Sequence, residues 1–315
     1  MSLSGCITAL VTPFKGARLD IAGLRKNVRF QLKNRVNGLL VNGSTGEAPN
    51  LSSGEWERAL AAVVAEVHGR VKVIAGAGTN STARSIRQAK RAAALGPDAL
   101  LVVAPYYNKP TQEGLYRHFR AIAEAVELPI IVYNIPPRSV VNILPATIER
   151  MAKDCDNIVA VKEASGSLDQ SSDIIQRCGN RVTVLSGDDS LTLPILSVGG
   201  KGVISVVSNI APLDVAKMIE HHRAGKVELA AGMHRRLFPL IKTMFIETNP
   251  TPVKAAMNML NMAAGEPRLP LVPPSENSLK AIRQALIDYG LPAGSAGHDR
   301  NPSENFGSCP KRSSE

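Results

Sequence analysis

The residue best placed for covalent chemistry is Lys162, which follows the apolar run 158–161. An apolar run without alternation is typical of a strand that is buried on both faces of a parallel sheet. A lysine at the end of such a strand lies partly out of water, which lowers the pKa of its amine and leaves some of it neutral near pH 7. A neutral amine can attack a ketone and form a Schiff base. The simpler alternative is a lysine whose ammonium group extends into solvent.

Schiff-base formation also requires proton transfers, and two tyrosines are candidates for them. Tyr133 ends the apolar stretch 130–133, so its hydroxyl could exchange protons with intermediates formed at the lysine. Tyr107 follows another apolar stretch and, together with Ser44, could pass the proton to solvent. The alternative for either tyrosine is a packing role with a buried ring and a hydrated hydroxyl.

Two further features could bind carboxylates. The turn 43–46, with the sequence Gly-Ser-Thr-Gly, offers backbone N–H groups and hydroxyls to an α-keto acid. The alternative is a tight turn that needs glycine only for its backbone conformation. Arg138 could grip a second carboxylate through two parallel hydrogen bonds, although a lone arginine is more often a surface residue. A second glycine-rich stretch, 199–202, is better explained as a turn into a strand than as a phosphate-binding loop.

These residues must be positioned by a strand–helix alternation that repeats along the chain. The predicted strands are 6–11, 38–41, 71–75, 99–103, 130–133, 158–162, 182–185 and 202–206. The predicted helices that follow them are 21–34, 52–68, 82–95, 111–126, 144–153, 167–178, 190–198 and 212–224. Eight such units in about 225 residues predict an α/β fold of the (β/α)8 TIM barrel type. The rival is a doubly wound open sheet, which favours a glycine-rich turn after the first strand, where Thr12-Pro13-Phe14 stands instead.

Beyond the barrel, assigned to residues 1–225, the chain continues as a C-terminal helical domain over residues 226–292. We expect residues 293–315, rich in Gly, Ser, Pro and Asn, to form a flexible tail. Chemistry in this type of barrel takes place at the C-terminal ends of the strands. All the candidates above fall there, and Gly187, after the seventh strand, and Ile204, in the eighth, belong to the same end.

Composition narrows the function further. No apolar window approaches the roughly 18 residues that span a bilayer, and the N-terminus lacks a secretory pattern, so we expect a cytoplasmic protein without a membrane partner. The four cysteines form no CxxC pair and suit free thiols in a reducing compartment. No metal-ligand spacing occurs, and we expect neither a metal nor another cofactor.

The formal net charge is +10, and much of the excess lies on two predicted helices near the N-terminus. One of them carries Arg84, Arg87, Lys90 and Arg91. A nucleic-acid surface is one interpretation. We favour a solvated helix face that also attracts anionic substrates, because no aromatic interleaving or nucleic-acid motif accompanies the charge.

Taken together, these stretches resemble the dihydrodipicolinate synthases, within the class I pyruvate aldolases that include N-acetylneuraminate lyase. The resemblance covers about residues 4–292. It is carried by residues 43–47, 105–108, 133–138, 161–164, 186–189 and 202–205. Arg138 and the run Tyr106-Tyr107-Asn108 favour the synthases over the sugar-acid lyases.

The resemblance implies a lyase that condenses pyruvate, held as a Schiff base on Lys162, with L-aspartate 4-semialdehyde on the path to lysine. It implies that Tyr133 is the acid–base group, with Ser44 completing the relay. By the same resemblance, Thr45 holds the pyruvate carboxylate and Arg138 holds that of the semialdehyde. Further implications are that Gly187 and the Ile204 carbonyl line the site, that Tyr107 comes from a neighbouring subunit, and that the enzyme is a homotetramer.

The sequence departs from the family pattern at several positions. Ser44 and Ser139 stand where threonine is usual in the synthases, and a serine at the first position is common in the lyases. Members inhibited by lysine place a histidine and a glutamate in an inter-subunit pocket, where this chain has Trp56 and Arg84. Arg84 would repel a lysine ammonium, so we expect lysine feedback to be weak or absent.

Three alternatives remain open from the sequence. The first is another Schiff-base pyruvate lyase or dehydratase, acting on a sugar acid or a hydroxyproline-derived keto acid. Arg138 speaks against it, since a polyhydroxylated substrate needs neutral hydrogen-bonding groups more than a fixed charge. The second is a catalytically silent barrel, which predicts the loss of Lys162 or Tyr133, and both are present. The third and weakest is a nucleic-acid binder.

Overall fold

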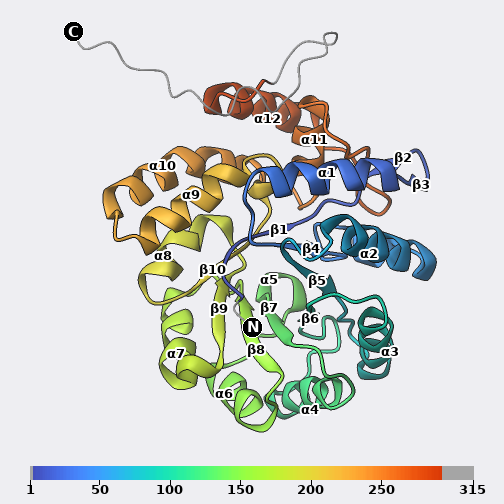
Figure 1. The fold of residues 1–315 in the computed structure, drawn as a ribbon, viewed down its shortest axis with the longest axis vertical. Coiled ribbons are helices and arrows are strands. Elements are labelled where there is room, and N and C mark those ends of the chain that lie inside the picture. The colour runs from blue at the N-terminus through green and yellow to red at the C-terminus, as the bar shows by residue number, and fades with distance from the viewer. Residues whose placement is uncertain (1–2, 293–315) are drawn as a thin grey trace.

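The computed structural model describes residues 3–292, in which eight parallel strands close into a barrel surrounded by helices (Figure 1). The barrel strands are β1 Gly5–Ala9, β4 Gly38–Val41, β5 Lys72–Gly76, β6 Ala99–Val103, β7 Ile130–Asn134, β8 Ile158–Glu163, β9 Thr183–Ser186 and β10 Gly202–Ser205. Neighbours in the chain are neighbours in the barrel, and β10 closes the ring on β1. The predicted (β/α)8 barrel is therefore confirmed.

Helices follow the strands and continue beyond the barrel. They are α1 Ile21–Lys33, α2 Ser53–Val67, α3 Thr82–Ala93, α4 Gln112–Ala123, α5 Pro136–Ser139, α6 Pro145–Asp154, α7 Leu168–Cys178, α8 Thr192–Ser197, α9 Pro212–Arg223, α10 Val227–Thr243, α11 Thr251–Met259 and α12 Glu276–Tyr289. Helix α10 runs beside α9, and α12 packs on α10 and α11 (Figure 1). A C-terminal helical part is thus present, while its division from the barrel at residue 225 stays a prediction. The tail 293–315 lies outside the described residues.

The strands are apolar on both faces because each face packs against other side chains. One cluster fills the inside of the barrel and includes Ile7, Leu40, Ile131 and Leu185. A larger cluster lies between the strands and the helices. Strands β1, β4 and β7 are buried at every position, as an uninterrupted apolar run requires.

Local signals set where the first helices begin. The Asp20 side chain accepts a hydrogen bond from the backbone N–H of Gly23 and caps α1. Ser52 and Glu55 form a reciprocal capping box at α2. Aspartate and serine are both among the residue types that favour helix N-termini.

Two elements escaped the sequence analysis. A hairpin of β2 Phe14–Lys15 and β3 Arg18–Leu19 precedes α1, and the one-turn helix α5 follows β7 where a loop was expected. Both are too short to show a hydrophobic period. Predicted ends of the longer elements differ from the observed ones by a few residues, as is usual where the terminal turns or residues leave the regular hydrogen-bond pattern.

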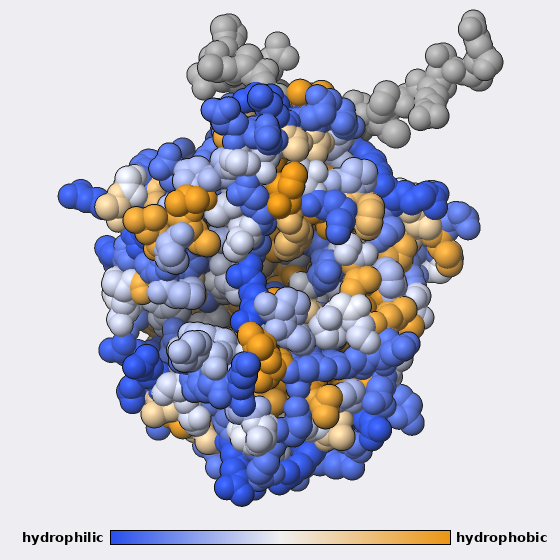
Figure 2. Space-filling model, turned by 180° about the vertical axis from the view of Figure 1, so that it is seen from behind, coloured by the Kyte–Doolittle hydropathy of each residue, from blue (hydrophilic) through white to orange (hydrophobic). Residues whose placement is uncertain are grey.

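Within residues 3–292, no helix is long and apolar enough to cross a membrane. On the face opposite to that of Figure 1, hydrophilic residues cover most of the surface and apolar residues form separate patches (Figure 2).

Candidate active site

Two neighbouring strands bring the candidate nucleophile and the candidate proton donor together. In the ladder between β7 and β8, Tyr133 pairs with Lys162. Successive residues of a strand point to opposite faces, so paired residues of adjacent parallel strands point to the same face. The Lys162 amine lies 4.2 Å from the centroid of the Tyr133 ring. The register of one strand pair therefore sets the distance between the two side chains.

Lys162 is almost completely buried, with 6% of its surface exposed. Burial lowers the pKa of Lys162 to about 7, opposed by the Asp189 carboxylate and aided by the charge of Arg138. A substantial share of the amine is therefore neutral, and nucleophilic, near pH 7. The alternative of an amine that extends into water does not describe this lysine.

The Tyr133 hydroxyl is protonated at neutral pH and lies close to Ser44. Burial raises the pKa of Tyr133 to about 12, although the Arg138 charge and a hydrogen bond with the Ser44 side chain oppose the shift. A protonated phenol hydrogen-bonded to a second hydroxyl is able to donate a proton and be resupplied with one. Ser44 supplies the hydroxyl that such a relay needs.

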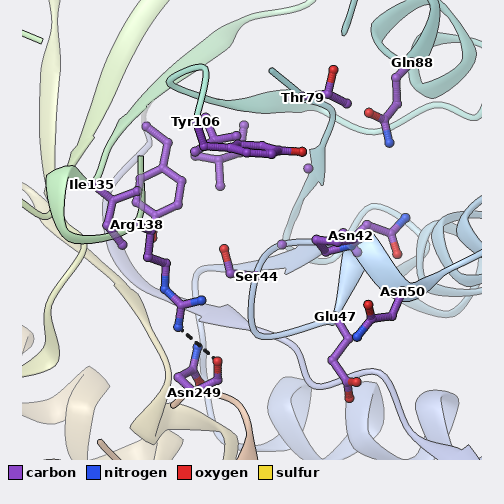
Figure 3. A pocket seen from close by; sticks show the side chains of 18 of the residues that line it. Asn42, Ser44, Glu47, Asn50, Thr79, Gln88, Tyr106, Ile135, Arg138 and Asn249 are labelled. Atoms are coloured by element: carbon purple, nitrogen blue, oxygen red, sulfur yellow. Dashed lines mark hydrogen bonds between the residues drawn. The ribbon is translucent and has the colours of Figure 1, made fainter. Parts of the chain in front are cut away.

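A cavity of about 360 Å³ opens beside these residues (Figure 3). Its walls include Ser44, Tyr133 and Arg138, together with Tyr106 and Asn249. This volume suits small metabolites. Lys162 does not itself line the cavity, and it adjoins the cavity wall through its contact with the ring of Tyr133.

Asn249 links the two candidate carboxylate-binding residues and was missed in the sequence analysis. Its side-chain amide donates to the Thr45 hydroxyl at 3.1 Å. Its backbone carbonyl accepts from the Arg138 guanidinium at 3.0 Å (Figure 3). The Oδ1 atom of Asn249 is buried without a hydrogen-bond partner among the described residues. The signal available in the sequence was the Asn-Pro-Thr-Pro stretch at 249–252.

Gly187 and Ile204 lie where the sequence analysis placed them, at the same end of the barrel. A Cβ atom on Gly187 would come within 3.2 Å of Lys162 Cε and within 2.7 Å of the Ala164 side chain. Any larger residue at position 187 would crowd the Lys162 and Ala164 side chains. Ile204 is buried in the barrel interior in the same cluster as Tyr133.

Tyr107 is not brought to the cavity of its own chain. Its side chain is 88% exposed, and its backbone φ of 74° lies in the left-handed region, which is uncommon for a residue with a bulky side chain. Tyr106 lines the cavity instead. The expectation that Tyr107 serves a neighbouring subunit stays a prediction.

Asp189 is a second residue that the sequence analysis left without a role. It is buried, and its Oδ2 accepts from the backbone N–H groups of Val206 and Val207 at 2.8 and 3.1 Å. Burial raises the pKa of Asp189, and these hydrogen bonds oppose the rise. These hydrogen bonds connect the turn after β9 to the end of β10. The negative charge of Asp189 raises the pKa of Lys162.

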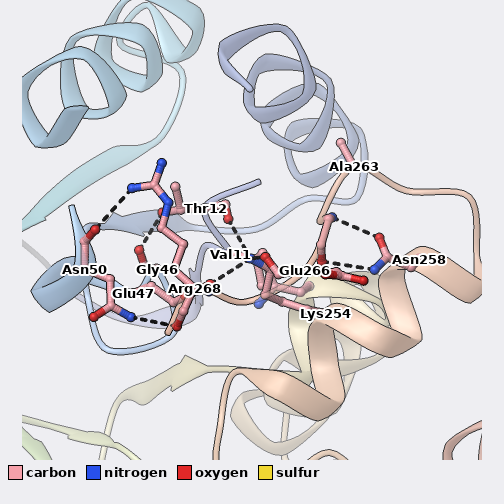
Figure 4. A network of polar contacts seen from close by, with 12 residues as sticks. Val11, Thr12, Gly46, Glu47, Asn50, Lys254, Asn258, Ala263, Glu266 and Arg268 are labelled. Carbon is pink, nitrogen blue, oxygen red and sulfur yellow. Dashed lines mark hydrogen bonds and ion pairs between the residues drawn. The ribbon is translucent and has the colours of Figure 1, made fainter. Parts of the chain in front are cut away.

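A buried ion pair holds the turn that carries Ser44 and Thr45. Lys254 Nζ lies 2.7 Å from Glu47 Oε1, and both side chains are inaccessible to solvent (Figure 4). The same amine donates to the backbone carbonyl of Glu266 at 3.0 Å. The other oxygen of Glu47 accepts from the backbone N–H of Arg268 at 2.8 Å. Lys254 therefore has a structural role, and its amine is already bound to groups of the protein.

Comparison with known proteins identifies the family. The model of the dihydrodipicolinate synthetase family matches residues 2–288. The chain belongs to this family. It is 50% identical over 287 residues to a 4-hydroxy-tetrahydrodipicolinate synthase of Syntrophus aciditrophicus, covering 91% of this chain and 98% of the relative.

Solved structures give the same result. A dihydrodipicolinate synthase from Thermotoga maritima superposes with a TM-score of 0.90 at 45% identity, covering 91% of this chain and 98% of the other. A synthase described as the first monomeric variant also has a TM-score of 0.90 at 45% identity, with 91% and 97% covered. The family predicted from the sequence is confirmed, and the relatives' names favour a synthase over a lyase of sugar acids.

Proposed function

We propose that this enzyme condenses pyruvate with L-aspartate 4-semialdehyde to give 4-hydroxy-tetrahydrodipicolinate, in the biosynthesis of diaminopimelate and lysine. The observation that carries the proposal is the pairing of Lys162, with a pKa near 7, and Tyr133 on adjacent strands. Membership of the dihydrodipicolinate synthetase family supports the identity of both substrates.

The first half of the reaction uses Lys162 as the nucleophile. Its neutral amine attacks the keto carbon of pyruvate and forms a carbinolamine. Tyr133 donates the proton with which the hydroxyl leaves as water, and Ser44 restores the proton to the phenol. Loss of a methyl proton from the resulting imine gives the enamine. Thr45, held by Asn249, binds the pyruvate carboxylate together with the N–H groups of its turn.

The second half joins the two substrates. The enamine carbon attacks the aldehyde carbon of the semialdehyde, whose carboxylate is bound by Arg138. The guanidinium is oriented for this purpose by the backbone carbonyl of Asn249. The amine of the semialdehyde then attacks the imine carbon, closes the ring and displaces the Lys162 amine. The enzyme returns to its starting state without a redox step.

Reduction with borohydride in the presence of pyruvate tests the nucleophile directly. We expect a stable adduct that peptide mapping places on Lys162, together with turnover of added semialdehyde by the unreduced enzyme. The variant Lys162→Arg should form no adduct, whereas Lys153→Arg, at an exposed helical position, should react as the unmodified enzyme does. An adduct without turnover would move the substrate to the sugar-acid class. Absence of an adduct would show that Lys162 is not the nucleophile and would contradict the proposed mechanism.

We also propose that the active assembly is a homotetramer in the cytoplasm. The exposure of Tyr107 supports an assembly, because a neighbouring subunit would cover this side chain and bring its hydroxyl to a second cavity. Sedimentation equilibrium would give the mass of a tetramer. A fully active monomer would contradict both the assembly and the role of Tyr107.

A further inference from the structure

A second cavity, of about 470 Å³, lies beside the substrate cavity and is bordered by α2 and α3. Ala48, Thr79 and Gln88 line both cavities, so the two cavities adjoin. Figure 3 shows Thr79 and Gln88 from the side of the substrate cavity. The other residues that line the second cavity are Leu51, Ser53, Trp56, Arg84, Arg87, Lys90 and Arg91. None of the residues that line it is acidic.

The positive charge of this cavity comes from one helix. Arg84, Arg87 and Arg91 are spaced by three and four residues, which places them on one face of α3, with Lys90 beside them. Arg91 forms an ion pair with Glu57 at 3.5 Å. Within residues 3–292, the other three cations form no ion pair with a carboxylate. The cluster therefore carries at least three positive charges that the protein does not balance locally.

Two features of α3 make this arrangement electrostatically unfavourable without a counterion. Like charges three or four residues apart repel one another on a helix. Arg84 also lies in the first turn, where the N–H ends of the helix already present positive potential, and this turn contains no acidic residue. An anion in the cavity would relieve both effects.

The remaining wall supplies fixed geometry and further donors. The Trp56 indole donates to the backbone carbonyl of Gly76 at 3.3 Å, which fixes the ring against the cavity. Ser53 adds a hydroxyl group, whereas the Thr79 hydroxyl already donates to the backbone carbonyl of Ser81 at 3.1 Å. Guanidinium groups bind phosphate and carboxylate oxygens in pairs.

We propose that this cavity is a binding site for a small multivalent oxyanion, a compound bearing phosphate groups or several carboxylates. The proposed carboxylate-binding residues, Thr45 and Arg138, lie outside this cavity. Trp56 and Arg84, which line it, stand where lysine-inhibited members of the family have a histidine and a glutamate in a pocket between subunits. The proposal is therefore that these residues change the charge of the ligand that this position accepts.

Trp56 provides the test, because it is the single tryptophan of the chain and lines the cavity. Titration of the full-length protein with pyrophosphate and, separately, with citrate should change its fluorescence saturably for at least one of them. A response to pyrophosphate alone identifies phosphate as the recognised group, a response to citrate alone identifies carboxylates, and a response to both identifies multivalent charge. No saturable change with either anion would overturn the proposal.

Variants show whether the response belongs to this cluster. The double variant Arg84→Glu/Arg87→Glu should weaken binding at least about tenfold, by analogy with the removal of a charge-assisted hydrogen bond. The control Arg235→Glu/Lys242→Glu makes the same charge change at exposed positions of α10 and should leave binding unaltered. Should charge reversal prevent folding, as judged by circular dichroism, Arg84→Gln/Arg87→Gln replaces it. Undiminished binding by a folded variant of either kind would also overturn the proposal.

Discussion

The amine of Lys162 and the ring of Tyr133 are 4.2 Å apart because the two residues are paired across β7 and β8. This relationship couples the nucleophile to the proton donor through the backbone ladder rather than through loops. Strands of a closed barrel have little freedom to slide, since a slip of one residue would exchange the two faces of every strand. The fixed register of β7 and β8 therefore holds the Lys162 and Tyr133 side chains at this distance.

The pKa of Lys162 predicts the acid side of the pH profile. Because only the neutral amine attacks, the rate of pyruvate adduct formation should rise with pH through about 7 and level off above it. The measurement is the trapping rate with borohydride between pH 5.5 and 9. In Arg138→Gln the inflection should move to higher pH, since the charge of Arg138 lowers this pKa. An inflection near the ordinary lysine pKa of 10.5 in the unmodified enzyme would contradict the expectation.

Removal of the Lys162 charge should stabilise the free enzyme. Its folded pKa, about 7, lies below the ordinary value of 10.5, so the unfolded chain binds the additional proton between these pH values. The loss of folding stability caused by burying the charged Lys162 amine is complete below pH 7 and disappears as the pH approaches 10.5. Lys162→Met should therefore increase the free energy of unfolding by about 1–3 kcal/mol at pH 7. Urea denaturation at pH 7 and pH 10 measures this, and a gain that does not shrink at pH 10 would argue against the charge as its cause.

Loss of the Tyr133 hydroxyl should slow the reaction while leaving the fold intact. Tyr133→Phe should lower kcat by about 10²–10⁴-fold, the usual contribution of a positioned acid–base group. Ser44→Ala should have a smaller effect and Ser44→Thr almost none, because threonine keeps the hydroxyl. Tyr116→Phe is the matched control, since that tyrosine is buried and hydrogen-bonded to Asp154 away from the cavity. Equal losses in Tyr133→Phe and the control would exclude a specific role.

Substitution of Arg138 should separate the two substrates. Arg138→Lys keeps the charge but not the paired hydrogen bonds, and should raise the KM for aspartate semialdehyde about 10–100-fold. The extent of the pyruvate adduct should be nearly unchanged, because the semialdehyde enters later. Steady-state kinetics with both substrates measures the difference. An unchanged KM for the semialdehyde would place its carboxylate elsewhere.

The buried pair Glu47–Lys254 should contribute more to stability as a pair than either member does alone. Lys254→Met leaves a carboxylate buried without its cation, which costs about 3–5 kcal/mol of unfolding free energy. The double variant Glu47→Gln/Lys254→Met should recover most of this loss. For comparison, Glu113→Gln, which affects pairs exposed at the surface, should leave the urea midpoint of unfolding almost unchanged. Additive losses in the double variant would show that the two side chains are not coupled.

The barrel was predictable from the sequence, because eight strand–helix units follow one another and strands such as β4 and β7 begin with apolar runs that do not alternate, as in a parallel sheet covered on both faces. The sequence also placed Lys162, Tyr133 and Gly187 at one end, since parallel strands share the direction of the chain. Short-range signals such as the capping box at Ser52 were equally legible, as their partners lie three residues apart.

Which distant residues meet depends on the tertiary fold and could not be predicted. Asn249 reaches Thr45 across 204 positions of the chain, and Lys254 reaches Glu47 across 207; no local pattern encodes such distances. The cationic face of α3 is exposed, as expected from the sequence, and only the fold shows that it also lines a cavity with Trp56. Packing of whole helices against the barrel sets these contacts, and it depends on the summed shape of many side chains rather than on any one motif.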